Sequence, residues 1–219
     1  MPKINDIREI KAAIFDLDGT LTNSAGMWLE SRDAFFKDFG IQGSPDHKKA
    51  MISMGFDTTS RYVIDEFKLD NSVEEITQYW MDYGAKRYAT DIELKQGVEE
   101  YFHMLHRNGV HICLATCCKL DLAHIVLDRH GIGHMFDYAL CADDMGVDKS
   151  TPDVFVKCAD HFGLPAGDCA IFEDSVVGIC TAYQAGFYTV AIQDPHSAYA
   201  LKTIQNNCDM LIEDFREFI

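Results

Sequence analysis

The segment Lys11–Thr22, with the sequence KAAIFDLDGTLT, constrains the fold of this chain more than any other stretch. It begins with the apolar run Ala12–Leu17 and is broken by Gly19, the pattern of a short buried strand followed by a turn. Two carboxylates, Asp16 and Asp18, stand where this strand ends. Ligands bind at the carboxyl ends of strands in open α/β sheets, and neighbouring acids near a core repel each other unless a cation or a shared proton relieves them. The segment therefore predicts a ligand site at a sheet edge, although two acids that merely cap a turn or helix remain an alternative.

Composition limits the class of protein. The chain has 219 residues, of which 47% are hydrophobic, enough for one core domain with a smaller insert. The formal net charge is -16, from 19 basic and 35 acidic residues. Such a charge repels nucleic acid and anionic membrane surfaces, so neither is expected as a partner. An anionic small molecule would need a local cation.

The sequence also predicts a cytoplasmic protein. It contains neither a long uncharged apolar run nor a cleavable signal pattern. Its eight cysteines include no CxxC motif, and several lie in apolar stretches, where a thiol behaves as a small hydrophobe in a reducing compartment. The nine histidines are scattered and predict no metal site. The oligomeric state is left open, with a monomer among the possibilities.

Two patterns divide the chain. Residues 26–90 have helical rather than alternating hydrophobic spacing, as in Met27–Phe39, which Gly40 ends. From Gly97 onward, strand-like runs alternate with helical ones. The expected strands are Val110–Ala115, Tyr138–Ala142, Cys169–Phe172, Tyr188–Ile192 and Met210–Ile212. The expected helices are Val98–Arg107, Leu120–Arg129, one that begins at Thr151-Pro152 with the proline in the first helical position and runs to Phe162, and one that ends at Ala185-Gly186.

Repeated strand–helix units predict an α/β fold, with a parallel sheet flanked by helices and right-handed crossovers. The sheet domain would comprise residues 1–22 and 94–219, and residues 23–93 would form an inserted helical domain. Hinges near Asn23 and near Asp91–Lys95 would let the insert move over the edge of the sheet.

Polar side chains follow the expected strands and would share one rim of the sheet. They are Asp16, Asp18, Thr116, Lys149, Glu173 and Asp174. Hard oxygen ligands from separate loops suit Mg²⁺, which shares its site with phosphate oxygens, and a lysine and a hydroxyl would hold the remaining oxygens. A carboxylate can attack phosphorus while a second acid protonates the leaving oxygen. Asp143 and Asp144, which follow another strand, are interpreted as turn formers.

With these motifs in this order, the chain resembles the haloacid dehalogenase superfamily. The likeness is to the branch of β-phosphoglucomutase and the sugar-phosphate phosphatases, in which a helical cap is inserted into a Rossmann-like core. Asp16–Thr20 matches the first motif, Thr116 the second, Lys149 the third and Phe172–Ser175 the fourth. A DxDGT motif alone is moderately specific, whereas the ordered set spans nearly the whole chain and is a strong signal.

The resemblance implies a phosphatase that acts on a small phosphorylated metabolite, with a sugar phosphate favoured. Asp16 would be the nucleophile, and Asp18 would be the general acid and base. The resemblance assigns Mg²⁺ to Asp16, Asp18 (through its carbonyl), Glu173 and Asp174. It assigns the phosphate to Gly19, Thr116, Cys117 and Lys149.

Four departures from the family pattern bear on the activity. Cys117 stands where many relatives have Asn, Ser150 replaces the Pro that usually follows the motif lysine, and Asn23 replaces an Asp near the hinge. Trp28 stands where the mutase branch has a cap histidine, which favours hydrolysis over a sugar phosphomutase. A dehalogenase is disfavoured because carbon–halogen chemistry has no use for the acid Asp18. A non-catalytic sugar-phosphate binding protein is disfavoured because a binder has no need of two repelling acids.

Candidate substrate contacts in the insert are Trp28, Gly55 and Phe56, the last two in a loop, Met51–Phe56, that resembles the cap loop entering the site. The alternative is that Trp28, Phe56 and Trp80 belong to a core or domain interface. The charged residues of the insert are interpreted as solvated, although one of them could reach a substrate anion. They are Lys48, Lys49, Arg61, Lys86 and Arg87.

Overall fold

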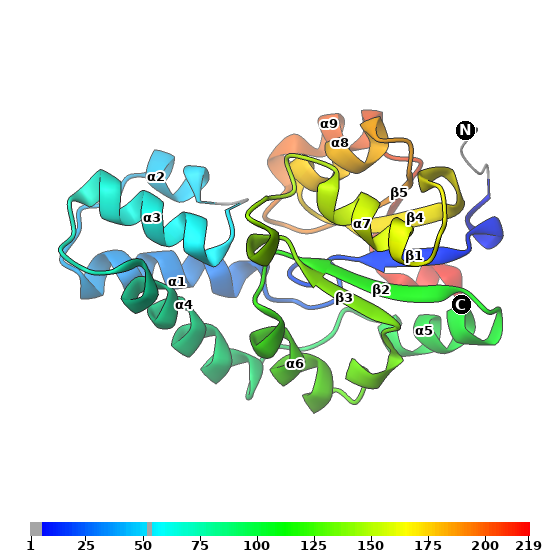
Figure 1. The fold of residues 1–219 in the computed structure, drawn as a ribbon, viewed down its shortest axis with the longest axis horizontal. Helices are drawn as coiled ribbons and strands as arrows, with labels where there is room; N and C mark the ends of the chain where they lie inside the picture. The colour runs from blue at the N-terminus through cyan, green and yellow to red at the C-terminus, as the bar shows by residue number, and fades with distance from the viewer. Residues whose placement is uncertain (1–5, 52–53) are drawn as a thin grey trace.

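The computed structural model describes residues 6–51 and 54–219. These residues form a six-stranded parallel sheet in the order β3-β2-β1-β4-β5-β6. The strands are β1 (Ala12–Phe15), β2 (His111–Thr116), β3 (Tyr138–Cys141), β4 (Cys169–Glu173), β5 (Tyr188–Ile192) and β6 (Met210–Ile212). Figure 1 shows the sheet between two layers of helices. The predicted α/β fold is confirmed.

Strand β1 lies inside the sheet, between β2 and β4, and all four of its residues are apolar and fully buried. Phe15 pairs with Leu114 of β2 on one side and with Phe172 of β4 on the other. The next residue, Asp16, still donates its amide to the Phe172 carbonyl at 3.0 Å. The ends of β1, β2 and β4 therefore meet at one rim.

Side chains alternate across the buried strands and supply two hydrophobic cores. Phe15, Leu114 and Phe172 point to one face of the sheet, and Ile14 and Cys113 point to the other. The first face is covered by α5 (Val98–Arg107) and α6 (Leu120–Arg129), and the second by α7 (Asp153–His161) and α8 (Val176–Gln184), with α9 (Leu201–Asn206) packed beside α8. The sheet is thus buried on both faces, as expected of a parallel sheet.

Four helices lie beside the sheet rim, to the left in Figure 1. They are α1 (Ala25–Asp38), α2 (Pro45–Ala50), α3 (Phe56–Phe67) and α4 (Val73–Tyr88). Ser44 and Ser72 start α2 and α4 with capping boxes. In each, the serine side chain accepts the backbone amide of the third helical residue, and the side chain of that residue accepts the serine backbone amide. This helical group has its own hydrophobic core, which consists of Phe35, Phe36, Met51, Val63, Ile76 and Trp80. We call residues 23–93 the cap, following the division that the sequence suggests.

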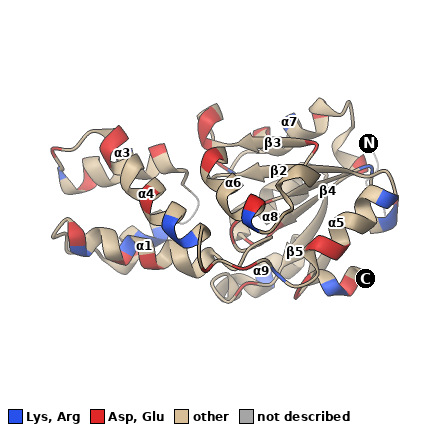
Figure 2. Ribbon diagram, turned by 90° about the horizontal axis from the view of Figure 1, so that it is seen from below, with Lys and Arg blue, Asp and Glu red and all other residues tan. Residues whose placement is uncertain are grey.

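The two connections between the cap and the sheet run side by side. The Asn23 amide donates to the Glu93 carbonyl at 2.9 Å, and the Lys95 amide donates to the Leu21 carbonyl at 2.8 Å. The segments proposed as hinges are therefore hydrogen-bonded to each other. Figure 2 shows acidic residues on the cap helices as well as around the sheet. Within the described residues, no helix is both long and apolar enough to cross a membrane.

The predicted bounds of α5, α6, β5 and β6 agree with the structure, but the predicted start of α7 is wrong by one residue. The Pro152 carbonyl accepts a hydrogen bond from Val156 at 2.9 Å, which makes Pro152 the residue that flanks the helix rather than its first member. Strand β4 extends one residue further than predicted, to Glu173, because Glu173 pairs with Ala191 of β5.

We expect Phe172→Ala to lower the free energy of unfolding by about 3–5 kcal/mol, because it empties a fully buried site in the core. Phe172 stacks on Phe15 with ring centroids 4.4 Å apart, directly below the acidic rim. Urea unfolding followed by circular dichroism would measure the loss. Tyr199→Ala, at a side chain that is 71% exposed, is the control and should change stability by less than about 0.5 kcal/mol. Equal effects of the two substitutions would contradict this account of the core.

Candidate active site

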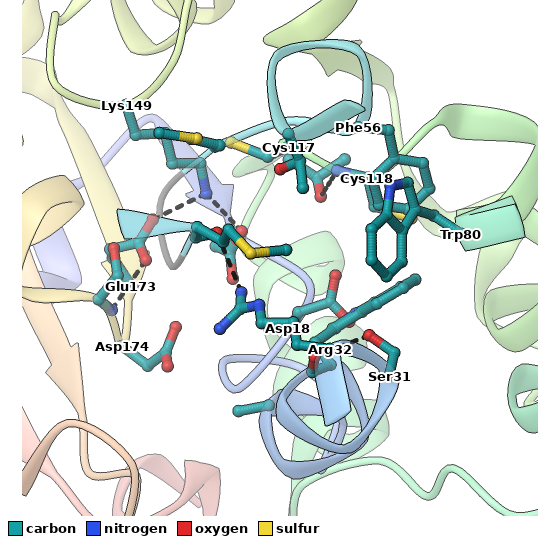
Figure 3. Close-up of a pocket in the computed structure, with 18 residues that line it drawn as sticks. Asp18, Ser31, Arg32, Phe56, Trp80, Cys117, Cys118, Lys149, Glu173 and Asp174 are labelled. Atoms are coloured by element: carbon teal, nitrogen blue, oxygen red, sulfur yellow. Dashed lines mark hydrogen bonds and ion pairs between the residues drawn. The ribbon is translucent and has the colours of Figure 1, made fainter. Parts of the chain in front are cut away.

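Three buried carboxylates and one buried amine meet at the rim of the sheet (Figure 3). Asp16 follows β1, Glu173 ends β4, and Asp174 comes next in the chain. Lys149 reaches them from the loop between β3 and α7, where its Nζ donates to Glu173 Oε2 at 2.8 Å and contacts Asp16 Oδ1. Burial alone would lower the pKa of Lys149, but attraction to Asp16 and Glu173 outweighs burial and raises it. Lys149 is therefore a permanent cation between two acids.

One ammonium does not neutralise three carboxylates. Burial raises the pKa of Asp16 to about 7, with Lys149 opposing the rise and Glu173 adding to it. Burial, together with repulsion from Glu173 and Asp16, raises the pKa of Asp174 well above its ordinary value. Asp174 has no cationic partner among the described residues, and its hydrogen bond is a 3.4 Å contact with the Thr20 hydroxyl.

The residues at this rim fit a divalent cation. Asp16, Glu173 and Asp174 each offer an oxygen, and these oxygens lie within 4.8 Å of one another. Buried carboxylates with an excess of negative charge are the ligands that Mg²⁺ takes in proteins. Gly19 makes the arrangement possible: its φ is +89°, and a Cβ there would lie 2.3 Å from an Asp174 carboxylate oxygen.

The Asp18 carboxylate lies outside that trio of acids and faces the cap. Its Oδ1 accepts hydrogen bonds from Ser24 Oγ at 2.5 Å, from Trp28 Nε1 at 2.8 Å and from the Tyr88 hydroxyl. Burial raises the pKa of Asp18, and the hydrogen bonds from these three residues oppose the rise. Because all three donors belong to the cap, the cap holds the second acid of the motif in place.

Strand β2 brings Thr116 and Cys117 to the same rim. The Thr116 Oγ1 accepts a hydrogen bond from the Cys118 amide at 2.9 Å, directly after the strand, and residues 116–118 all line the pocket described below. Burial raises the pKa of the Cys117 thiol to about 12, so this thiol is neutral at physiological pH. It is not a candidate nucleophile, because only a thiolate attacks readily.

A cavity of about 170 Å³ lies between the rim and the cap. From the rim it is lined by the predicted residues Asp16, Asp18, Thr116, Cys117, Lys149, Glu173 and Asp174. From the cap it is lined by Trp28, Met51, Met54, Phe56 and Trp80. Site residues predicted from four separate strand ends and from the cap are thus brought together around one pocket.

Two residues that the sequence analysis assigned to the site do not line the pocket. Gly19 and Gly55 are not among the lining residues. A Cβ on Gly55 would lie 2.4 Å from Asp143 Oδ1, so this glycine lies where the cap meets the sheet part. Residues 52 and 53 of the expected cap loop lie outside the described residues.

Asp143 lies in a short 3-10 turn, as expected of a turn former, but it also connects the sheet part to the cap. It is buried, and its carboxylate accepts the Asp57 amide, at the start of α3, at 3.0 Å. Lys119 Nζ lies 3.1 Å from Asp143 and 2.8 Å from Asp144, and it also reaches Asp57 at 3.4 Å. This cluster of charges ties α3 to the rim.

Sequence reasoning missed several residues of the site. They are Ser24, Ser31, Arg32, Thr59, Tyr88 and Cys118. Arg32 follows Trp28 by four residues, a spacing that places both on one face of α1, so this signal was available. Tyr88 left no such signal, because it lies 70 residues from Asp18 in the chain.

The chain belongs to the haloacid dehalogenase-like hydrolases, whose family profile matches residues 13–192. It is 26% identical over 226 residues to a probable pseudouridine-5'-phosphatase of Drosophila melanogaster, covering 95% of each chain. Two solved structures share its fold. A predicted phosphoglycolate phosphatase from Haemophilus somnus has a TM-score of 0.77 at 22% identity, covering 97% of this chain and 98% of that one. A β-phosphoglucomutase from Clostridium difficile has a TM-score of 0.78 at 18% identity, covering 96% and 93%. The resemblance drawn from the motifs is confirmed.

We expect Gly19→Ala to destabilise the protein more than Gly109→Ala. Both glycines have positive φ, which costs an alanine about 1–2 kcal/mol. Only at position 19 would the new methyl group also collide with a carboxylate, whereas Gly109 has nothing within 4 Å. Urea unfolding of the two variants would show the difference. Equal losses of stability would mean that the new methyl group at position 19 does not clash with the Asp174 carboxylate, which would contradict this account of Gly19.

Proposed function

We propose that this protein is a Mg²⁺-dependent phosphatase that hydrolyses the phosphomonoester of a small metabolite, such as a sugar phosphate, through an aspartyl-phosphate intermediate. The observation that carries the proposal is the buried Asp16, in contact with the Lys149 ammonium, at a pocket that also contains Asp18. The names of relatives agree with it, since a validoxylamine A 7'-phosphate phosphatase and a hexitol phosphatase are among them.

Asp16 is the proposed nucleophile. A carboxylate oxygen of Asp16 would form a bond to phosphorus as the bond from phosphorus to the leaving oxygen breaks. Lys149 opposes the effect of burial on the pKa of Asp16 and so favours the ionised form that attacks. In the second step water would attack phosphorus, which releases inorganic phosphate and restores the Asp16 carboxylate. The proposed holders of the phosphate oxygens are the Thr116 hydroxyl, the turn at Cys117 and the Lys149 ammonium, which line the pocket, together with Gly19.

Asp16, Glu173, Asp174 and the backbone carbonyl of Asp18 are the proposed holders of Mg²⁺. When bound, the cation neutralises the charge of the phosphate and of the acids around it. Without such a cation the acid cluster would repel an incoming phosphate, because three buried carboxylates face a single lysine.

Asp18 is the proposed general acid in the first step and general base in the second. Its three hydrogen bonds all end on Oδ1, which fixes the direction of the carboxyl group. The indole N–H of Trp28 only donates, so it cannot exchange protons as the cap histidine of the mutase branch does. The contact between Trp28 and Asp18 therefore favours hydrolysis over a phosphomutase.

We expect Asp16→Asn to abolish the release of p-nitrophenol from p-nitrophenyl phosphate, because an amide is not a nucleophile toward phosphorus. Asp160→Asn is the matched control, since Asp160 is exposed on α7, lies outside the pocket and should leave turnover unchanged. Turnover of the Asp16 variant within tenfold of the parent would exclude Asp16 as nucleophile.

Asp18→Asn should separate the two steps. p-Nitrophenolate leaves without a proton, whereas the alkoxide of glycerol 3-phosphate needs one. Rapid-quench measurements should therefore show a burst of p-nitrophenol followed by slow turnover, but no burst of glycerol. Steady-state turnover of both compounds should fall by about 10²–10⁴-fold, the usual size of acid–base catalysis. Steady rates near those of the parent would contradict the role of Asp18.

Product analysis distinguishes the rival functions. Incubation of glucose 1-phosphate with Mg²⁺ should release inorganic phosphate. Faster formation of glucose 6-phosphate would identify a phosphomutase instead. Calorimetric binding of a hexose phosphate without any phosphate release would identify a binding protein.

A further inference from the structure

Arg32 brings a positive charge into the cap side of the pocket. It lies on α1, one turn after Trp28, and Figure 3 shows it among the residues that line the pocket. Its guanidinium donates to the Met51 carbonyl at 3.0 Å and to the Lys48 carbonyl at 3.5 Å, both at the end of α2. A guanidinium has five N–H donors, so these two contacts leave part of the group available.

No carboxylate among the described residues pairs with Arg32. The other lysines and arginines in the described part of the chain that are not exposed all form ion pairs with acids, and Arg87 of the same cap pairs with both Glu30 and Asp91. Burial lowers the pKa of Arg32 to about 10, and no neighbouring acid raises it. A partly buried cation without a counter-ion is a favourable place for an anion.

A second donor without a partner lines the same pocket. Trp80 is 3% exposed, and its Nε1 is the one buried side-chain nitrogen or oxygen in the described part of the chain that has no hydrogen-bond partner. Met51, Met54 and Phe56 line the apolar remainder of the cap side. The cap therefore offers donors, whereas the rim offers Asp16, Glu173 and Asp174.

We propose that Arg32 binds a second anionic group of the substrate, remote from the phosphate that is transferred. This inference rests on the proposed phosphatase function. The transferred phosphate would lie at the rim, beside Asp16 and Lys149, and the second group would lie at the cap. That group is a carboxylate or a second phosphate, because the planar guanidinium fork matches the oxygens of both. Hydrogen bonds to charged groups would give such substrates a preference of about tenfold to a hundredfold.

The experiment compares matched phosphate esters by kcat/KM. Glucose 6-phosphate has no second anion, whereas 6-phosphogluconate has a carboxylate. Fructose 6-phosphate and fructose 1,6-bisphosphate differ by a second phosphate. We expect the parent protein to prefer the anionic member of at least one pair by tenfold or more, mainly through KM, and the preferred pair tells which anion is bound.

Three variants assign the preference. Arg32→Gln removes the charge but keeps an amide that can donate to the Met51 carbonyl, so the preference should fall to less than twofold. Arg32→Lys keeps the charge and should retain part of the preference, and it decides the question if the glutamine variant does not fold. Arg61→Met, at an exposed arginine of the same cap outside the pocket, is the matched control and should keep the full preference.

The outcomes separate this inference from the function on which it rests. Equal kcat/KM within both pairs, or a preference that survives Arg32→Gln, would overturn the role of Arg32 while hydrolysis of p-nitrophenyl phosphate still supports a phosphatase. Arg32 would then serve only to hold the end of α2. Failure to hydrolyse p-nitrophenyl phosphate and all four esters would overturn the phosphatase. In that case, calorimetry of the same esters decides the role of Arg32: tighter binding of an anionic member that Arg32→Gln abolishes would support it, and equal binding would overturn it.

Discussion

The site depends on burying more negative charge than the protein itself neutralises. Asp16, Glu173 and Asp174 are all buried at the rim, and Lys149 is the cation that contacts two of them. Removing carboxylates from water is unfavourable unless cations and hydrogen bonds compensate. The central position of β1 imposes this arrangement, since both neighbouring strands end beside it. The parallel sheet holds the strand ends side by side, and Gly19 leaves room for the Asp174 carboxylate.

The cap forms part of the site as well as covering it. Asp18 belongs to the sheet part by sequence, yet its carboxylate is held by Ser24, Trp28 and Tyr88 of the cap. The cap is further tied to the rim through the contacts of Asp57 with Asp143 and Lys119. A displacement of the cap would therefore change both the closure of the pocket and the position of the second acid. This coupling offers a physical route by which substrate binding at the cap could influence proton transfer at the rim.

Arg32 and Lys149 are the two positively charged side chains among the described residues that line the pocket, and their surroundings differ. Lys149 contacts the carboxylates of Asp16 and Glu173, whereas Arg32 contacts backbone carbonyls. Both line one pocket, one from the sheet and one from the cap, so the positive charges available to an anionic substrate lie at its two sides. An overall charge of -16 would weaken binding of large polyanions, whereas these two local positive charges would favour a small anion.

Much of the fold could be predicted from the sequence because it rests on local patterns. The hydrophobic runs and their glycine breaks determined β1, α5 and α6, and the order of the motifs determined the family. The same motifs indicated the rim residues Asp16 and Lys149, because strand ends in a parallel sheet meet at one edge. Only the tertiary structure decided that Tyr88 and Trp28 hold Asp18, and that Arg32 faces the pocket without an acid partner. These contacts arise where segments far apart in the chain pack against one another, and side-chain periodicity along one segment carries no information about what the opposite surface presents.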